Sequence, residues 1–140
     1  MKVYLDFDGT VVEHNYPKIG AYNPLSMEVV KKLQNAGHEI VLNTFRVEFR
    51  NHSEQEALDY VNKDGFKLKK IRCTSFKIIP EHYNIKKAID RNVLFIDDAS
   101  IGTPLIDSIS TKGKMVDWVF LDKEFKKYGL YKKIGFLGLF

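Results

Sequence analysis

Two pairs of acidic residues follow apolar, strand-like stretches of this chain. Asp6 and Asp8 stand two positions apart after the first stretch, and Asp97 and Asp98 follow a later one. Two carboxylates about 4 Å apart repel each other by roughly 4 kcal/mol at an effective dielectric constant of 20, so four of them in one place need a compensating cation. Oxygen ligands favour Mg²⁺, which also keeps water and phosphate oxygens as ligands. The acids therefore predict a magnesium site.

A hydroxyl group and a lysine suited to hold phosphoryl oxygens accompany the acids. Thr44 ends a second strand-like stretch, and Lys77 stands between a third stretch and a predicted helix. Lys86 or Lys87 in that helix could take the place of Lys77. Positioning and neutralisation of charge do most of the work in phosphoryl transfer, so this set of residue types is typical of that chemistry.

The turn after the first strand decides whether its two acids can act together. Asp6 and Asp8 can both face the site only if the backbone turns after Phe7, which Gly9 assists. Gly9, and Thr10 after it, would let the backbone approach a phosphoryl group and present amide hydrogens to it. One carboxylate could then attack phosphorus, while the other gives a proton to the leaving oxygen and later activates water.

Strand-like and helix-like segments alternate along the chain. An Asn-Pro pair at positions 23–24 and a Ser-Glu-Gln-Glu stretch at 53–56 are typical helix starts. The expected strands are 3–7, 39–43, 70–74 and 93–96, with an edge strand at 118–121, and the expected helices begin near 24, 53 and 80, with a last one at 122–128.

This alternation predicts an α/β domain with a mostly parallel sheet covered by helices on both faces, as in Rossmann-like folds. Ligands bind beyond the carboxyl ends of the strands in such sheets. The acids, the threonine and the lysine all stand at or after strand ends, so we expect them at one edge of the sheet.

The motifs resemble those of the haloacid dehalogenase (HAD) superfamily of phosphohydrolases. The stretch DFDGTV at positions 6–11 resembles its first motif, Thr44 its second, Lys77 its third, and LFIDD at 94–98 its acidic fourth. The resemblance extends over residues 2–100. It implies a three-layer catalytic core. Cap domains of this superfamily follow the first motif or the second, but 11–24 has room only for a flap and 45–76 for one helix and one strand.

The resemblance also implies roles for the residues. Asp6 would be the nucleophile that forms an aspartyl-phosphate, and Asp8 the general acid and base. Mg²⁺ would be held by Asp6, the carbonyl of Asp8 and Asp97, with Asp98 in support. Thr44 and Lys77, with Gly9 and Thr10, would bind the phosphoryl group. An acid at position 8 is similar to the phosphatase branch rather than to the ATPases.

Two further residues are candidates for contact with substrate. Arg46, two positions after Thr44, could bind an anionic group of the substrate or pair with a surface acid. His14 lies in the expected flap with Tyr16 and could reach the substrate from there.

The length and composition of the chain indicate its domain organisation and location. The chain has 140 residues and a net charge of +4, of which residues 111–140 supply the whole excess with seven basic and three acidic residues. We expect a single domain over 1–140, with a core at 1–110 and a C-terminal edge element and basic tail at 111–140. One cysteine, no leader-like segment and no long apolar run favour a cytoplasmic location without membrane contact.

These observations predict a Mg²⁺-dependent phosphohydrolase. A small-molecule phosphate monoester is the expected partner, a phosphorylated nucleic-acid end remains open, and so does oligomer formation. Two alternatives use the same fold: a phospho-acceptor domain, disfavoured because its acidic pair would come from the first strand, and a catalytically idle phosphate-binding module. The substrate itself is not determined by the sequence.

Overall fold

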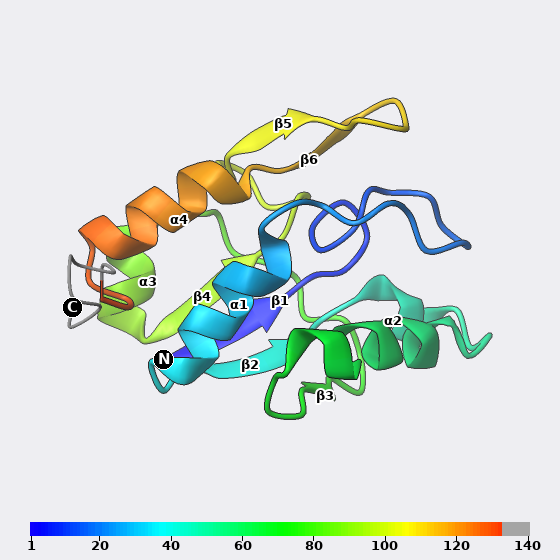
Figure 1. The fold of residues 1–140 in the computed structure, drawn as a ribbon, viewed down its shortest axis with the longest axis horizontal. Coiled ribbons are helices and arrows are strands. Elements are labelled where there is room, and N and C mark those ends of the chain that lie inside the picture. Colours follow the sequence, from blue (N-terminus) through cyan, green and yellow to red (C-terminus); the bar gives the residue numbers. More distant parts are fainter. Residues whose placement is uncertain (133–140) are drawn as a thin grey trace.

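The structure is a computed structural model that describes residues 1–132 (Figure 1). The helices are α1 (Ser26–Asn35), α2 (Ser53–Val61), α3 (Ile85–Arg91) and α4 (Trp118–Lys127), with two short 3-10 helices, η1 (Phe45–Glu48) and η2 (Asp64–Phe66). The strands are β1 (Lys2–Leu5), β2 (Glu39–Leu42), β3 (Arg72–Cys73), β4 (Val93–Ile96), β5 (Leu105–Asp107) and β6 (Lys114–Val116).

Four strands form one parallel sheet in the order β3-β2-β1-β4. Leu5 at the end of β1 lies between Leu42 of β2 and Ile96 of β4, so these three strands end at the same level. The predicted α/β domain with a mostly parallel sheet is confirmed. β1 and β2 are the two central strands of the sheet. The residues that follow them therefore lie between the ends of the outer strands β3 and β4.

The helices gather on one face of this sheet. Side chains alternate between the two faces of a strand. The residues of one face share a hydrophobic core with buried residues of all four helices; on the sheet side these are Val3, Leu5, Ile40, Leu42, Leu94 and Ile96. On the opposite face Tyr4 stacks on Phe95 with ring centroids 4.9 Å apart, and neither ring nor the neighbouring Val41 belongs to that core.

The prediction of helices on both faces of the sheet is therefore wrong for the described residues. The second face is bordered by the chain after β3, where Thr74 and Ile78 line a hollow together with Tyr4 and Val41. Apolar residues on both faces of the strands indicated burial on both faces, and Val41 and Phe95 are indeed buried. Residue types alone do not tell whether a helix or a loop provides the cover.

The chain after β4 differs most from its prediction. Residues 118–121 were expected to form an edge strand, but they are the first turn of α4, whose start is capped by the Asp117 carboxylate accepting from the Phe120 amide at 3.0 Å. The predicted last helix is thus present and begins earlier. An antiparallel hairpin of β5 and β6 precedes it and was not predicted, because the residues of β5 are all exposed and carry no buried pattern.

The helix starts at positions 23 and 53 also use other contacts than expected. Asn23 donates through its side-chain amide to the carbonyls of Thr10 and Val116, both at 2.9 Å, and α1 begins later, at Ser26. Ser53 is the first residue of α2, and its hydroxyl donates to the Asn51 side chain at 2.6 Å. Asn23 thus fastens the loop after β1 to the end of β6.

The loop between β1 and α1 rests against the β5–β6 hairpin, as Figure 1 shows. The Glu13 carboxylate accepts from the amides of Ser110 and Thr111 at 2.8 and 3.3 Å, and the Val116 amide donates to the carbonyl of Gly9 at 3.0 Å. Within residues 1–132 neither expected insertion point carries a cap domain. The segment 111–132, expected to begin a tail, is built into the domain, whereas the end of that tail, 133–140, lies outside the described residues.

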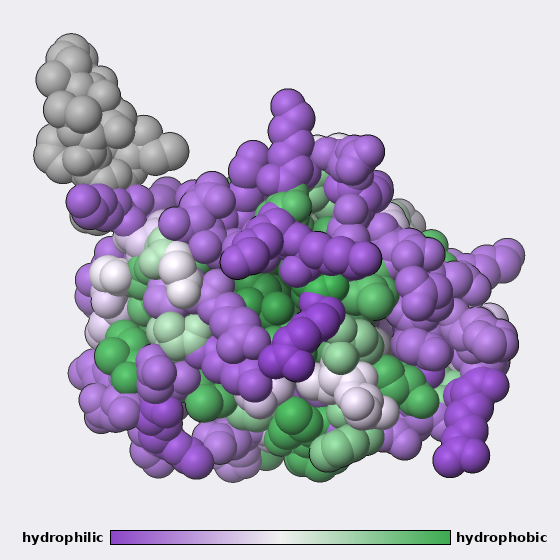
Figure 2. Space-filling view, turned by 90° about the horizontal axis from the view of Figure 1, so that it is seen from below, coloured by the Kyte–Doolittle hydropathy of each residue, from purple (hydrophilic) through white to green (hydrophobic). Residues whose placement is uncertain are grey.

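The surface is mixed in character. On the face shown in Figure 2, groups of hydrophobic residues lie among hydrophilic ones. None of the helices in residues 1–132 has the length and apolar character needed to cross a membrane.

Candidate active site

The four strand ends meet at one pocket of about 390 Å³. Asp6 follows β1, Thr44 follows β2 after one residue, Lys77 stands a few residues beyond β3, and Asp97 follows β4. All four line the pocket, together with Asp8, His14, Arg46 and Asp98. The predicted gathering of these residues at one edge of the sheet is what the structure shows.

Asp6 is a buried residue of this pocket and has few hydrogen-bond donors around it. Its Oδ2 accepts from the Thr10 hydroxyl at 3.0 Å, and its Oδ1 accepts from Lys77 Nζ at 3.3 Å. Burial raises the pKa of Asp6 well above its usual value, and the charge of Asp97 raises it further, while Lys77 acts in the opposite direction. Ionisation of Asp6 therefore costs more free energy than usual, and a second cation near its carboxylate would reduce this cost.

Asp6, Asp97 and Asp98 form a compact group of carboxylates. One oxygen from each lies within 4.8 Å of those from the other two. Burial also raises the pKa of Asp98, with the charge of Asp97 acting in the same direction. The approach of Asp98 requires glycine at position 9: a Cβ on Gly9 would lie 2.3 Å from Asp98 Oδ2, and its φ of +77° is unfavourable for other residues.

Lys77 bridges two of these acids. Its Nζ donates to Asp97 Oδ2 at 2.7 Å, to Asp6 Oδ1 at 3.3 Å and to the carbonyl of Asn43 at 3.0 Å, and its side chain is only 2% exposed. Burial disfavours its charge, but the two carboxylates outweigh burial and raise the pKa of Lys77. Of the three candidate lysines this one reaches the acids, since Lys86 and Lys87 lie on exposed positions of α3.

Asn43 and Glu48 hold the segment that carries Lys77. The Asn43 side chain accepts from the amide of Ile78 and donates to its carbonyl, both at 2.8 Å, and Glu48 accepts from the Lys77 amide at 3.0 Å. Neither residue was predicted from the sequence. A polar residue directly before Thr44 at the end of an apolar strand was the signal available for Asn43.

Asp8 forms a two-point ion pair with Arg46 rather than joining the other acids. Arg46 Nε donates to Asp8 Oδ2 at 2.7 Å, and its Nη2 donates to Asp8 Oδ1 at 2.8 Å. Such paired hydrogen bonds fix both position and orientation of a carboxylate. The Asp8 carboxylate is therefore not part of the group formed by Asp6, Asp97 and Asp98, and the carbonyl of Asp8, which the resemblance implies as a ligand, remains a candidate.

Arg46 is one of the largest fully buried side chains of the protein, with 1% exposure. Its guanidinium carbon lies 5.2 Å from the ring centroid of Phe7 and 5.1 Å from that of Tyr16. It also donates to the carbonyl of Lys18 at 3.1 Å and that of Ser53 at 3.3 Å. Neither interpretation from the sequence anticipated this: the acid that pairs with Arg46 is Asp8, inside the pocket.

The backbone amides of Gly9 and Thr10 do not face the pocket as predicted. Gly9 donates to the carbonyl of Val12 at 2.8 Å and Thr10 to that of Phe7 at 3.1 Å, so both amide hydrogens are used within the tight turn. The Thr10 hydroxyl instead donates to Asp6 and accepts from the Asp98 amide at 3.2 Å. Both residues shape the site, and their predicted role in phosphate binding is corrected to one of support.

Thr44 and His14 lie where the sequence expected them. The Thr44 side-chain oxygen accepts from the Arg46 amide at 3.1 Å, which leaves its own hydrogen free to donate into the pocket. His14, on the loop between β1 and α1, lines the same pocket. Both can therefore contact a bound molecule.

The donor set suits a magnesium ion. Four carboxylates against Lys77 and Arg46 leave a formal charge of −2 when all groups are ionised, which one divalent cation would balance. The oxygens of Asp6, Asp97 and Asp98 are hard ligands. Burial is the main cause of the raised pKa values of Asp6 and Asp98, and the charge of Asp97 acts in the same direction.

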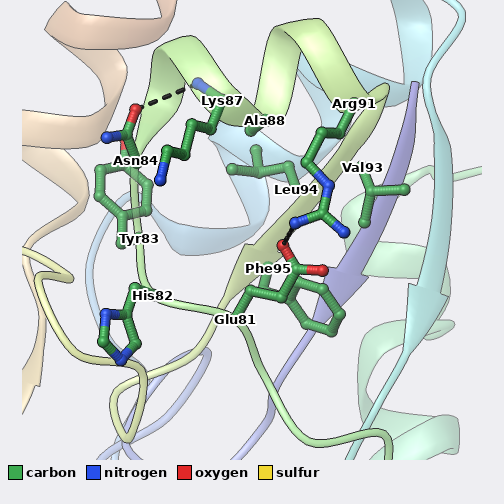
Figure 3. A pocket seen from close by; sticks show the side chains of 10 residues that line it. All are labelled: Glu81, His82, Tyr83, Asn84, Lys87, Ala88, Arg91, Val93, Leu94 and Phe95. Atoms are coloured by element: carbon green, nitrogen blue, oxygen red, sulfur yellow. Dashed lines mark hydrogen bonds and ion pairs between the residues drawn. The ribbon is translucent and has the colours of Figure 1, made fainter.

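A second cavity of about 450 Å³ lies beside α3 and β4 (Figure 3). Arg91 Nη1 donates to Glu81 Oε2 at 2.6 Å across it, and the Asn84 side chain accepts from the Lys87 amide. In the view of Figure 3 the Glu81–Arg91 pair lies beside Phe95. This cavity is larger than the pocket at the strand ends, but its one acid is already paired.

Comparisons with known proteins support the fold. No known protein family matches this chain, and no curated protein matches its sequence. A solved structure of a protein from Bacteroides thetaiotaomicron, described only as conserved, is 25% identical, with 100% of this chain and 97% of that chain covered and a TM-score of 0.60. The likeness is to a small α/β domain with a mostly parallel sheet, and the description of that protein names no activity.

Proposed function

We propose that this protein is a Mg²⁺-dependent phosphatase that hydrolyses phosphate monoesters through an aspartyl-phosphate on Asp6. The observation that carries the proposal is the group of Asp6, Asp97 and Asp98 within 4.8 Å of one another, with Lys77 beside it. The order of the motifs along the chain and their resemblance to the HAD superfamily support the same reaction.

Asp6 is the nucleophile in this proposal. One of its carboxylate oxygens forms a bond to phosphorus while the bond between phosphorus and the ester oxygen breaks, which releases an alcohol. In this proposal Lys77 and the hydroxyl of Thr44 hold phosphoryl oxygens, and Lys77 exchanges one of its three hydrogen bonds within the protein for one to the phosphoryl group. When bound between Asp6, Asp97 and Asp98, Mg²⁺ would offset the negative charge of the phosphoryl group and of the acids around it.

Asp8 moves the protons. It gives one to the leaving oxygen and later takes one from the water that hydrolyses the aspartyl-phosphate. Both of its oxygens accept from Arg46, so one of these two hydrogen bonds must open for each transfer. Arg46 is thus a positioning residue that keeps Asp8 at the wall of the pocket.

The test is hydrolysis of a panel of phosphate monoesters with and without Mg²⁺. We expect release of inorganic phosphate that EDTA stops and added Mg²⁺ restores. Protein quenched in acid during turnover should gain the mass of one phosphoryl group, and the Asp6→Asn variant should not. Undiminished hydrolysis by purified Asp6→Asn protein would overturn the proposal.

A second candidate function is a phosphate acceptor that keeps its phosphoryl group. The hydrogen bonds of Arg46 to both Asp8 oxygens favour it, because a carboxylate held in this way activates water poorly. It predicts that an acyl phosphate donor labels Asp6 once per molecule without further release of phosphate. Continuous release of phosphate under the same conditions decides for the phosphatase.

A further inference from the structure

Three aromatic side chains line the pocket that contains Asp6. Tyr16 comes from the loop after β1, Phe45 begins η1, and Phe49 directly follows η1; all three line the pocket. Phe45 is 48% exposed and Phe49 is 52% exposed. Burial of a phenylalanine side chain normally stabilises the folded protein. Two half-exposed phenylalanine rings at the same pocket are therefore an unusual arrangement.

The rings are held in place by neighbours within the site. The centroids of Tyr16 and Phe49 lie 4.8 Å apart, and the Tyr16 hydroxyl accepts from the Asn51 side-chain amide at 2.7 Å. Lys77 Nζ lies 5.0 Å from the centroid of Phe45. The pocket therefore offers aromatic surface, with Tyr16 and Phe49 in contact, to a bound molecule.

The size of the pocket fits a ligand larger than phosphate. Its volume of about 390 Å³ falls within the range of about 300–1,000 Å³ typical of sites for small organic molecules. The polar groups of the pocket lie where the phosphoryl group of a substrate is expected. The aromatic rings are then available to contact the part of the substrate that carries the phosphoryl group. Aromatic side chains bind flat rings by stacking, with little regard to the substituents on the ring.

We propose that the substrate is a small phosphate monoester whose leaving alcohol carries a flat aromatic ring, and that this ring stacks on the cluster of Tyr16, Phe45 and Phe49. This inference rests on the proposed function, because it assigns a substrate class to the same site. A nucleoside alcohol and a benzyl-type alcohol share this chemistry.

Two matched pairs of substrates test the proposal. Uridine 5′-monophosphate and ribose 5-phosphate release the same kind of primary alcohol and differ by the base. Benzyl phosphate and cyclohexylmethyl phosphate differ in the flatness of the ring. We expect kcat/KM to favour the aromatic member on the order of tenfold, in the nucleotide pair if the natural ring is a base and in the benzyl pair if it is a simple aryl group.

Three leucine variants locate the effect. Phe45→Leu and Phe49→Leu keep an apolar side chain without the aromatic face, and we expect them to reduce the preference toward unity, mainly by raising KM for the aromatic member. Phe120→Leu is the matched control, since Phe120 is 49% exposed but lies on α4 and does not line the pocket. It should leave the preference unchanged.

The outcomes separate the two proposals. Hydrolysis of both members of each pair with equal kcat/KM overturns the inference and leaves the phosphatase standing, as does a preference that survives both pocket variants. Failure of the protein to hydrolyse any of the four substrates, or any other phosphate monoester, overturns the proposed function and this inference with it.

Discussion

Asp6 at the pocket and Asp122 at the junction of α1 and α4 are both carboxylates among charged groups, but their surroundings are opposite. Asp122 accepts from Lys32 Nζ at 2.7 Å, from Lys126 Nζ at 2.9 Å and from the Tyr131 hydroxyl at 2.5 Å. Although its partial burial acts the other way, these donors lower the pKa of Asp122 to about 2. One acid with three donors is a stable arrangement.

Asp6 instead shares one lysine with Asp97, while Asp98 lies close by, and its pKa is raised. The protein thus keeps three acids near one ammonium group at the strand ends, where ionisation is costly, and satisfies a single acid fully elsewhere. Titratable groups whose pKa values are perturbed by burial and by like charges occur at functional sites more often than well-paired groups do. The difference supports the proposal that the cluster around Asp6 carries the chemistry, whereas the contacts of Asp122 are those of a stabilising group.

The largest effect should come from Asp6→Asn. We expect phosphate release to fall by a factor on the order of 10³ or more, because the nucleophile is gone. The midpoint of thermal unfolding should stay the same or rise, since a crowded carboxylate becomes a neutral amide. Phosphate assays and calorimetry on one preparation measure the activity and the unfolding midpoint. A clear drop in the midpoint would contradict the inference that Asp6, unlike Asp122, does not stabilise the fold.

Arg46→Gln should lower both activity and stability. Removing one partner of a buried ion pair costs about 3 kcal/mol or more in free energy of unfolding, since Asp8 loses both of its hydrogen bonds. Denaturant unfolding measures the loss. The control is Arg72→Gln, which breaks an exposed pair with Glu39 and should cost far less, because solvent screens exposed pairs. Equal losses in the two variants would show that the Arg46 pair is not special.

Asp122→Asn should affect stability alone. We expect a loss of about 1 kcal/mol at neutral pH, after allowing for screening by solvent, with kcat unchanged. The folded-state pKa of Asp122, about 2, lies below its ordinary value of 3.8, so its contribution is present above pH 4 and disappears as the pH falls toward 2. Unfolding curves of both proteins should therefore converge across that window, and a constant gap would contradict it.

The smallest effect should come from Arg91→Gln in the cavity beside β4. The Glu81–Arg91 pair is exposed, with side-chain exposures of 46% and 61%, so we expect a change in unfolding free energy within about 0.5 kcal/mol. Phosphate release should not change. A marked loss of activity would mean that the cavity beside α3 and β4 takes part in the reaction, which would contradict the assignment of the chemistry to the Asp6 pocket.

Much of the fold was predictable because it rests on local patterns. β4 coincides with the apolar stretch 93–96, and β2 falls within the predicted 39–43. The hairpin of β5 and β6 was not predictable, since its residues carry little buried apolar pattern and it is fixed by contacts with Glu13 and Gly9, about a hundred residues earlier in the chain. The same holds for the start of α4: the Trp118 ring nitrogen donates to the carbonyl of Thr10 at 2.8 Å, a contact that no local pattern predicts, and 118–121 are helical.

The sequence by itself determined which residue types leave the strand ends, and parallel pairing then required Asp6, Thr44 and Asp97 to meet at one edge. Only the tertiary structure decided the pairings within that group. It placed Asp8 on Arg46, Lys77 between Asp6 and Asp97, and the aromatic rings beside them. The reason is physical: the position of each strand along the chain follows from local periodicity, whereas the partner of a charged side chain depends on distances between segments far apart in the chain.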